Sequence, residues 1–260
     1  MGFFQDISCP NALTPIIFCN NYYFCILYIF TMQKLVVLSG AGMSAESGIR
    51  TFRDTGGLWE EYDVTEVATP MAWWKNRELV LRFYNERRKQ LAKASPNEGH
   101  TALAELGKFF DVKIITQNVD DLHERAGSKS ILHLHGELTK ARSTSEPSLI
   151  YDIGYGDINP GDKCEKGSQL RPHIVWFGEA VPMMDEAVKI TAEADIFVVV
   201  GSSLNVYPAA GLIGFTPATA SLWLIDPNDV YIPGTRKVEV IKEKASTGIA
   251  ILTKRLMNLS

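Results

Sequence analysis

The sequence predicts an α/β fold in which a doubly wound parallel sheet carries a smaller lobe built from two inserts. Short runs of aliphatic and β-branched residues recur along the chain, and stretches with helical spacing separate them. Strands that alternate with helices are typical of a parallel sheet covered on both faces. Polar clusters follow several of these runs, and such sheets bind ligands beyond the carboxyl ends of their strands. We therefore expect a binding site at that edge.

Residues 1–31 differ from the rest because they are apolar and aromatic and contain no Lys or Arg. A secretory signal needs a basic start, which this segment lacks. Its apolar run, 16–30, is interrupted by Asn20 and Asn21 and is shorter than the roughly 20 residues that span a bilayer. We interpret the segment as an extension upstream of a single domain, 32–260, that begins naturally at Met32. A weak membrane-surface anchor is the alternative.

The first predicted strand, 34–39, leads into "GAGMSAESG", where small residues precede a helix start. Glycines let a backbone approach a pyrophosphate, and a helix N-terminus favours its charge. A tight strand–helix turn without any ligand is the alternative. Further strands are expected at about 111–116, 130–136, 195–200, 221–225 and 238–241, with helices at 100–110 and 184–194.

Two stretches interrupt this alternation. Residues 59–95 are helical in pattern, whereas 136–172 are rich in Gly, Ser, Pro and Lys. We expect both to form a smaller lobe over the sheet edge, so that the large lobe comprises about 32–58, 96–135 and 173–260. A cleft between two lobes is a candidate binding site.

Two histidines near the end of the third predicted strand are candidate general bases. An imidazole with a pKa near 6.5 suits proton abstraction at neutral pH. His133 and His135 are two residues apart and share a strand face, so spacing alone does not choose between them.

Charge and cysteine content limit the classes of partner and compartment. The net charge is −4, so no overall basic field favours nucleic acid or anionic lipid. The four cysteines lie at 9, 19, 25 and 164 and show no regular framework. We expect a reduced, cytoplasmic protein without a membrane or nucleic-acid partner.

Five motifs occur in order: "GAGMSAESGIRTFRD", "TQNVDDLHERAG", "LHGEL", "LRPHIVWFGE" and "GSSLNVYPAA". This order resembles the sirtuin family of NAD-dependent protein deacylases over Lys34 to Leu256. The resemblance implies a Rossmann-like large lobe that binds NAD, with the acylated lysine of a protein or peptide as substrate. The acyl group would pass to ADP-ribose with release of nicotinamide.

The resemblance also implies roles for individual residues. The "HG" pair identifies His135 as the general base that activates a ribose hydroxyl, and Phe52 with Arg53 would close over the nicotinamide ribose. Asp226 stands where the family usually has Asn, which puts the adenosine contacts there in doubt, and Ala245 would lie near the adenine. The residues expected to contact NAD are Gly40, Ala41, Gly42, Ser44, Ala45, Gly48, Ile49, Phe52, Arg53, Gln117, Asn118, Asp120, Gly201, Ser202, Ser203, Asp226 and Ala245.

The substrate peptide would lie as an added strand between Val175–Glu179 and Asn205–Tyr207. Val175 and Phe177 would line the lysine tunnel, with core packing as the alternative. "FYNERR" resembles the branch that removes malonyl and succinyl groups, in which Tyr84 and Arg87 would bind the distal carboxylate. A solvated helix side is the alternative for this charge run. The expected substrate contacts are Ala68, Tyr84, Arg87, Val175, Phe177, Gly178, Glu179, Asn205, Val206 and Tyr207.

Most sirtuins hold a structural zinc with two C-x-x-C pairs, but this chain has only Cys164 in that region. A structural zinc site needs four N or S ligands. We therefore expect a degenerate zinc module without zinc. Two other functions remain open: mono-ADP-ribosyl transfer on the same scaffold, and a non-catalytic sensor of NAD or ADP-ribose.

Overall fold

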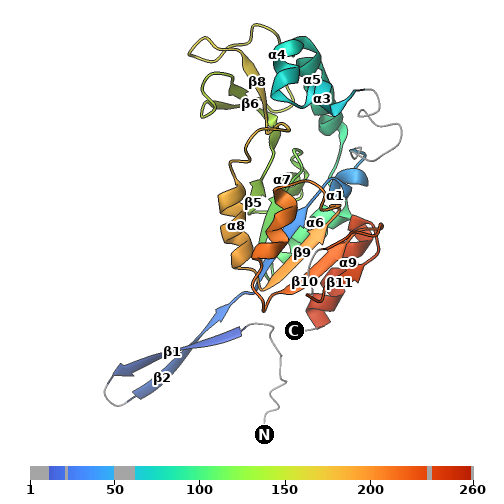
Figure 1. The fold of residues 1–260 in the computed structure, drawn as a ribbon. Coiled ribbons are helices and arrows are strands. Elements are labelled where there is room, and N and C mark those ends of the chain that lie inside the picture. The colour runs from blue at the N-terminus through green and yellow to red at the C-terminus, as the bar shows by residue number, and fades with distance from the viewer. Residues whose placement is uncertain (1–11, 21–22, 50–61, 233–235, 259–260) are drawn as a thin grey trace.

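Strand β3 (Lys34–Ser39) lies at the centre of a parallel sheet in the computed structural model, which describes residues 12–20, 23–49, 62–232 and 236–258 (Figure 1). The six strands follow the order β11-β10-β9-β3-β4-β5. The others are β4 (Asp111–Thr116), β5 (Ile131–His133), β9 (Ile196–Val200), β10 (Ser221–Ile225) and β11 (Glu239–Ile241). The strand order reverses between β3 and β9, where folds of this kind bind their ligands. The predicted parallel sheet is confirmed, although β5 ends at His133 rather than at residue 136.

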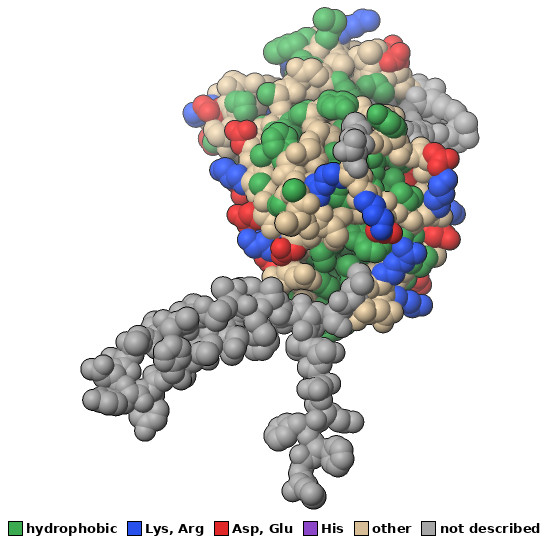
Figure 2. All heavy atoms as spheres, turned by 60° about the horizontal axis from the view of Figure 1, so that its bottom comes forward, with side chains coloured by type: hydrophobic (Ala, Val, Ile, Leu, Met, Phe, Trp, Pro, Cys, Tyr) green, Lys and Arg blue, Asp and Glu red, His purple; other side chains and the backbone are tan. Residues whose placement is uncertain are grey.

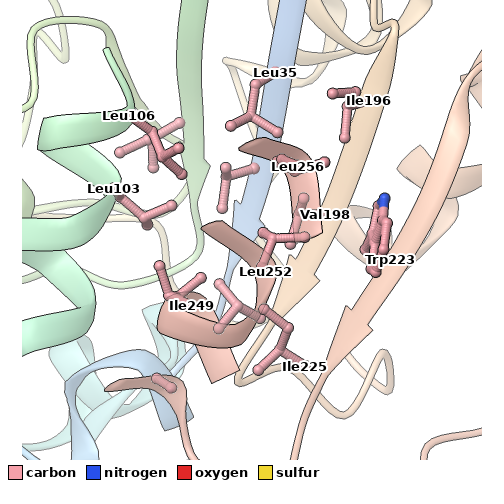
Figure 3. Packing of buried hydrophobic residues seen from close by; sticks show 14 of the residues in the cluster. Leu35, Leu103, Leu106, Ile196, Val198, Trp223, Ile225, Ile249, Leu252 and Leu256 are labelled. Atoms are coloured by element: carbon pink, nitrogen blue, oxygen red, sulfur yellow. The ribbon is translucent and has the colours of Figure 1, made fainter. Parts of the chain in front are cut away.

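Helices cover both faces of this sheet, so the strands are apolar on both sides. On one face Leu35 and Val37 belong to a core with α6 (Glu98–Leu106) and α9 (Ala245–Asn258), part of which Figure 3 shows. On the other face Val36 and Leu38 pack with α8 (Met184–Ala192) and the 3-10 helix η1 (Ala209–Phe215). Two short helices, α1 (Gly42–Ala45) and α7 (Leu122–Arg125), follow the carboxyl ends of β3 and β4.

A second lobe has its own core. It contains α3 (Val64–Val67), α4 (Pro70–Lys75) and α5 (Arg77–Lys93), together with an antiparallel sheet of β6 (Gly136–Ser143), β7 (Ile150–Asp152) and β8 (Leu170–Ile174). Figure 1 shows these elements at one end of the molecule, beyond the carboxyl edge of the parallel sheet. The sequence did not predict this sheet, because the buried positions of β6 do not alternate regularly: Leu138 and Ala141 are three residues apart, at an irregularity in the pairing with β8.

Strands β1 (Ala12–Asn20) and β2 (Tyr23–Thr31) pair antiparallel in a two-stranded sheet that is separate from the other two sheets (Figure 1). The sequence had not indicated strands in this leader. Among the described residues no helix is both long and apolar enough to cross a bilayer. On the face shown in Figure 2, Lys and Arg side chains are interspersed with Asp and Glu rather than gathered in one patch.

Candidate active site

A pocket of about 830 Å³ lies at the carboxyl edge of the parallel sheet and is lined from both lobes. The β3–α1 turn, the ends of β4, β5, β9 and β10, and helix α5 all contribute to its wall. Every predicted site residue in the described part of the chain lines it except Gly48 and Asn205. Phe52 and Arg53 lie outside the described residues.

The two exceptions lie beside the pocket. Gly48 follows α1, and its N–H donates to the carbonyl of Ala45 at 3.0 Å, so it closes the short helix. Asn205 is exposed and precedes Val206, which does line the pocket.

The glycine turn is fixed by the neighbouring strand. A Cβ on Gly40 would lie 2.7 Å from the carbonyl oxygen of Gly201, a residue that itself has a φ of +59°. The N–H of Gly42 donates to that same carbonyl at 2.9 Å. The glycines are therefore required first by the close approach of two loops at the switch point. The result is a pocket wall made largely of backbone, which suits a pyrophosphate.

Polar side chains next to this turn are held by one another. Ser44 Oγ donates to Asp120 Oδ2 at 2.9 Å, and Asn118 Nδ2 donates to the carbonyl of Gly40 at 3.0 Å. Gln117 Nε2 donates to Ser202 Oγ at 3.0 Å. Burial raises the pKa of Asp120, against the opposing effect of its hydrogen bond from Ser44. Fixed carboxylate, amide and hydroxyl groups at a sheet edge suit the hydroxyls and carboxamide of a nucleotide, so the residues present fit NAD.

His135 faces this group of polar residues, and its tautomer follows from its partner. Its Nδ1 lies 3.0 Å from the carbonyl oxygen of Gln117, which can only accept, so Nδ1 carries the proton. The lone pair of Nε2 is then available to accept another proton. Burial lowers the pKa of His135, and the bond to Gln117 only partly offsets this. The imidazole is therefore neutral at pH 7 and can act as a base.

His133, the other candidate base, does not line the pocket. Its Nε2 lies 2.7 Å from Glu124 Oε1, and its Nδ1 lies 3.2 Å from the carbonyl of Asn118. Burial by itself lowers the pKa of His133, but the hydrogen bond and charge of Glu124 outweigh burial and raise it. Both ring nitrogens are thus engaged away from the pocket.

The part of the pocket in the small lobe is mostly apolar. Ala68 and the ring of Tyr84 are buried there, with Leu138 and Ile174 alongside. Burial raises the pKa of Tyr84 to about 12, so its hydroxyl stays protonated. Burial also lowers the pKa of Arg87, while the neighbouring Tyr84 and Asp120 act in the opposite direction. The only strongly basic side chain in this part of the lining is therefore that of Arg87, among the described residues.

The segment after β8 forms the mouth of the pocket. The N–H of Val175 donates to the carbonyl of His135 at 2.9 Å, and the N–H of Phe177 donates to that of Ala68 at 3.0 Å. Val175 and Phe177 both line the pocket, and Phe177 is exposed. Tyr207 also lines the pocket and is 71% exposed, so two exposed aromatic rings belong to its lining.

At the opposite end of the pocket, Asp226 follows β10. Its Oδ1 accepts from the backbone N–H and the side-chain amide of Asn228 at 2.9 and 3.1 Å. One carboxylate oxygen is thereby used in a local turn. Lys244 and Ala245 complete this end of the lining.

Cys164 is held without a metal-ligand set around it. Its thiol donates to Ser143 Oγ at 3.4 Å, so its side-chain partner is a hydroxyl. Among the described residues no group of three or more His, Cys, Asp or Glu side chains could hold a metal ion. The residues present do not fit a four-ligand zinc site.

Sequence reasoning missed the residues that surround Tyr84. Trp176 donates from Nε1 to the Tyr84 hydroxyl at 3.0 Å, and Arg171 lies over the Trp176 ring. One signal was available: in an extended segment Trp176 must point to the side opposite Val175 and Phe177.

Comparisons with known proteins agree with this geometry. Residues 40–208 match the sequence profile of the Sir2 family. A protein named NAD-dependent protein deacylase from Bacteroides thetaiotaomicron is 54% identical over 231 residues, which cover 87% of this chain and 99% of that protein. One of the same name from Helicobacter pylori is 51% identical over 231 residues, which cover 88% of this chain and 100% of that protein.

Solved structures are similar over the same region. The crystal structure of a Sir2 homologue in complex with NAD has a TM-score of 0.79 and 39% identity, covering 88% of this chain and 91% of that chain. A Sir2 mutant solved with a deacetylated peptide and acetyl ADP-ribose has a TM-score of 0.73 and 28% identity, covering 86% of this chain and 94% of that chain.

Proposed function

The chain belongs to the Sir2 family, and we propose that it is an NAD-dependent protein-lysine deacylase that prefers acyl groups ending in a carboxylate. The acyl group would pass from a lysine side chain of a protein or peptide to ADP-ribose, with release of nicotinamide. Relatives at 54% and 51% identity carry the name deacylase, and the Sir2 homologue at 39% identity was solved with NAD.

One observation carries the proposal: a single pocket contains both His135 with a free Nε2 and the pair Tyr84 and Arg87. The first supports the transfer chemistry, and the second supports the choice of acyl group. Tyr84 and Arg87 are three residues apart on α5, so they project from one helix face. A guanidinium and a phenol together suit a carboxylate acceptor.

Residues at different positions along the pocket would have different roles. The backbone of the glycine turn would hold the pyrophosphate, and Gln117, Asn118 and Asp120 would orient the nicotinamide ribose. When bound, NAD supplies an electrophilic ribose carbon with nicotinamide as the leaving group. His135 accepts a ribose hydroxyl proton at Nε2, while the carbonyl of Gln117 keeps Nδ1 protonated. Phe177 and Tyr207 would flank the substrate peptide at the mouth.

The acyl preference is tested with one peptide that carries acetyl-, malonyl-, succinyl- or glutaryl-lysine, assayed with NAD. Removing one partner of a desolvated charge pair costs about 2–5 kcal/mol, or roughly 30- to several-thousand-fold. Arg87→Met should therefore lower kcat/KM on succinyl-lysine by at least about tenfold and leave acetyl-lysine within a few-fold.

Arg82→Met is the matched control, because Arg82 is exposed on the same helix and does not line the pocket. Arg82→Met should leave kcat/KM unchanged on both succinyl-lysine and acetyl-lysine. Equal losses on both substrates in Arg87→Met would remove the support for the acidic-acyl preference. Failure of the wild-type protein to release nicotinamide with any acyl peptide would favour a sensor.

A further inference from the structure

We propose that Trp176 is a positioning residue that fixes the Tyr84 hydroxyl as a hydrogen-bond donor toward the acyl end of the pocket. This inference rests on the proposed function of Tyr84 and Arg87. It adds a specificity-determining contact that acts through Tyr84 rather than on the substrate's carboxylate directly.

The hydrogen bond between the two rings sets the direction of the hydroxyl proton. Trp176 Nε1 lies 3.0 Å from the Tyr84 hydroxyl oxygen, and the two residues are 2% and 3% exposed. An indole N–H can only donate, so it occupies a lone pair of that oxygen. A hydroxyl has a single proton, and that proton cannot also be directed at the indole. It is left for an acceptor in the pocket, which both residues line.

Trp176 is itself held by charged groups on its far side. The guanidinium of Arg171 lies 3.2 Å from the centre of its ring, and Arg171 Nη1 donates to Glu179 Oε1 at 2.7 Å. Glu179 Oε2 accepts from the backbone N–H of Trp176 at 2.8 Å and from Arg142 Nη2 at 3.2 Å. We call Arg171 and Glu179, which hold Trp176 from both its ring and its backbone, the clamp. Glu179 was predicted as a substrate contact, but its carboxylate is hydrogen-bonded within this clamp.

The three arginines near the pocket have different surroundings. Arg171 and Arg142 are ion-paired with Glu179. Arg87 lines the cavity. A carboxylate that enters would meet the guanidinium of Arg87 and a hydroxyl already oriented to donate. An acetyl group ends in a methyl, and this end offers no acceptor to that hydroxyl. The effect of Trp176 should therefore be limited to acyl chains that end in a carboxylate.

The test is a double-mutant cycle of Trp176→Phe and Tyr84→Phe, with kcat and KM measured on succinyl- and acetyl-lysine peptides. Loss of one hydrogen bond should raise KM for succinyl-lysine about two- to twelvefold in Trp176→Phe, with kcat little changed. Acetyl-lysine kinetics should stay within twofold, which also reports that the variant is folded. In the Tyr84→Phe background, Trp176→Phe should add no further rise.

Trp73→Phe is the matched control. Trp73 is 2% exposed and packs against Trp176 at 5.7 Å between ring centres, but its Nε1 has no hydrogen-bond partner among the described residues. It should leave the succinyl-to-acetyl ratio unchanged. An equal change of the ratio in Trp73→Phe, or a rise in KM that persists in the Tyr84→Phe background, would overturn the positioning role.

A spectroscopic measurement keeps the two proposals distinguishable. The indole N–H resonance of Trp176 is assigned by its loss in Trp176→Phe. In the wild-type protein it should be protected from exchange, and in Tyr84→Phe it should shift. No shift would overturn the inference whatever the kinetics. If the resonance shifts but Arg87→Met lowers kcat/KM equally on both substrates, the proposed preference for acidic acyl groups fails. Trp176 then orients Tyr84 without contributing to acyl selectivity. If Arg87→Met is selective and Trp176→Phe is not, the inference alone fails.

Discussion

At the scale of single residues, the carbonyl of Gln117 determines which nitrogen of His135 can act as a base. The bond of 3.0 Å to Nδ1 fixes the proton there and leaves Nε2 to the pocket. His133 meets Glu124 instead. The pattern of the sequence left the two histidines equivalent, because it shows that they share a strand face but not that β5 ends at His133. Only the family motif separated them.

His135→Ala should lose turnover and keep NAD binding. General-base removal typically costs about 10²- to 10⁴-fold in rate, so kcat should fall by that amount. The dissociation constant of NAD, measured by calorimetry, should stay within a few-fold because the backbone turn and Gln117 are unaltered. An undiminished rate would transfer the role to a different residue.

The pH dependence should reflect the depressed pKa of His135. Burial lowers that pKa from its ordinary value of 6.5, more than the Gln117 carbonyl raises it. The base form is therefore present at neutral pH and is lost only as pH falls through a value below 6.5. The acidic limb of kcat/KM, measured on an acetyl-lysine peptide to avoid titration of a substrate carboxylate, should have its midpoint below 6.5. A midpoint above that value would show that a different group titrates.

At the scale of elements, the charge run of α5 does not lie wholly on a solvated side of the helix. "ERRKQ" could be a solvated helix side, but Arg88 is 0% exposed. The spacing 84, 88 and 91 places Arg88 on the buried face with Tyr84 and Leu91. The helical period was therefore available in the sequence. The carbonyl groups that accept hydrogen bonds from Arg88 could not be predicted, because they belong to segments without regular spacing.

Arg88 joins α5 to the rest of the small lobe. Its Nε donates to the carbonyl of Gly156 at 2.8 Å, Nη1 donates to that of Leu138 at 3.5 Å, and Asn85 accepts a further bond. These contacts join α5 to β6 and to the segment that follows β7. Burial lowers the pKa of Arg88 to about 10, so the guanidinium stays charged and hydrogen-bonded at pH 7.

Arg88→Met should destabilise the fold by about 2–3 kcal/mol, because hydrogen bonds from a charged group are lost and the carbonyl of Leu138 stays buried without this donor. The free energy of unfolding in urea measures this. Arg82→Met on the exposed side of α5 should change it by less than about 0.5 kcal/mol. Similar values for the two variants would show that Arg88 does not hold the lobe.

At the scale of the whole molecule, the parallel sheet could be predicted because each strand is a short apolar run with a polar cluster after it. The order of the strands brings Gly40, Gln117, His135 and Gly201 to one edge, and this too follows from the topology. The small-lobe sheet could not be predicted, because the buried positions of β6 lose their alternation between Leu138 and Ala141, where the pairing with β8 is irregular. The clamp of Arg171 and Glu179 on Trp176 depends on those same segments.

Residues 1–31 should be dispensable for folding, because the central strand β3 begins after them. The backbone N–H of Lys34 donates to Asp195 Oδ2 at 2.8 Å, and the carbonyl of Gln33 accepts from the N–H of Asp111 at 3.0 Å. The bonds that hold β3 in the parallel sheet thus start at Gln33. The hairpin of β1 and β2 pairs only within its own sheet, and a lone two-stranded hairpin is marginally stable at best.

A chain that begins at Met32 should therefore unfold at the same urea concentration as the full chain and show the same kcat/KM. A chain that begins at Val37 is the control: it loses half of the strand that pairs with both β4 and β9, and should not fold. Because β3 lies in the middle of the sheet, no neighbouring strand can replace it. If removal of residues 1–31 instead lowered the free energy of unfolding by more than about 1 kcal/mol, a change well outside the usual surface effect, the hairpin would have to be counted as part of the folded domain.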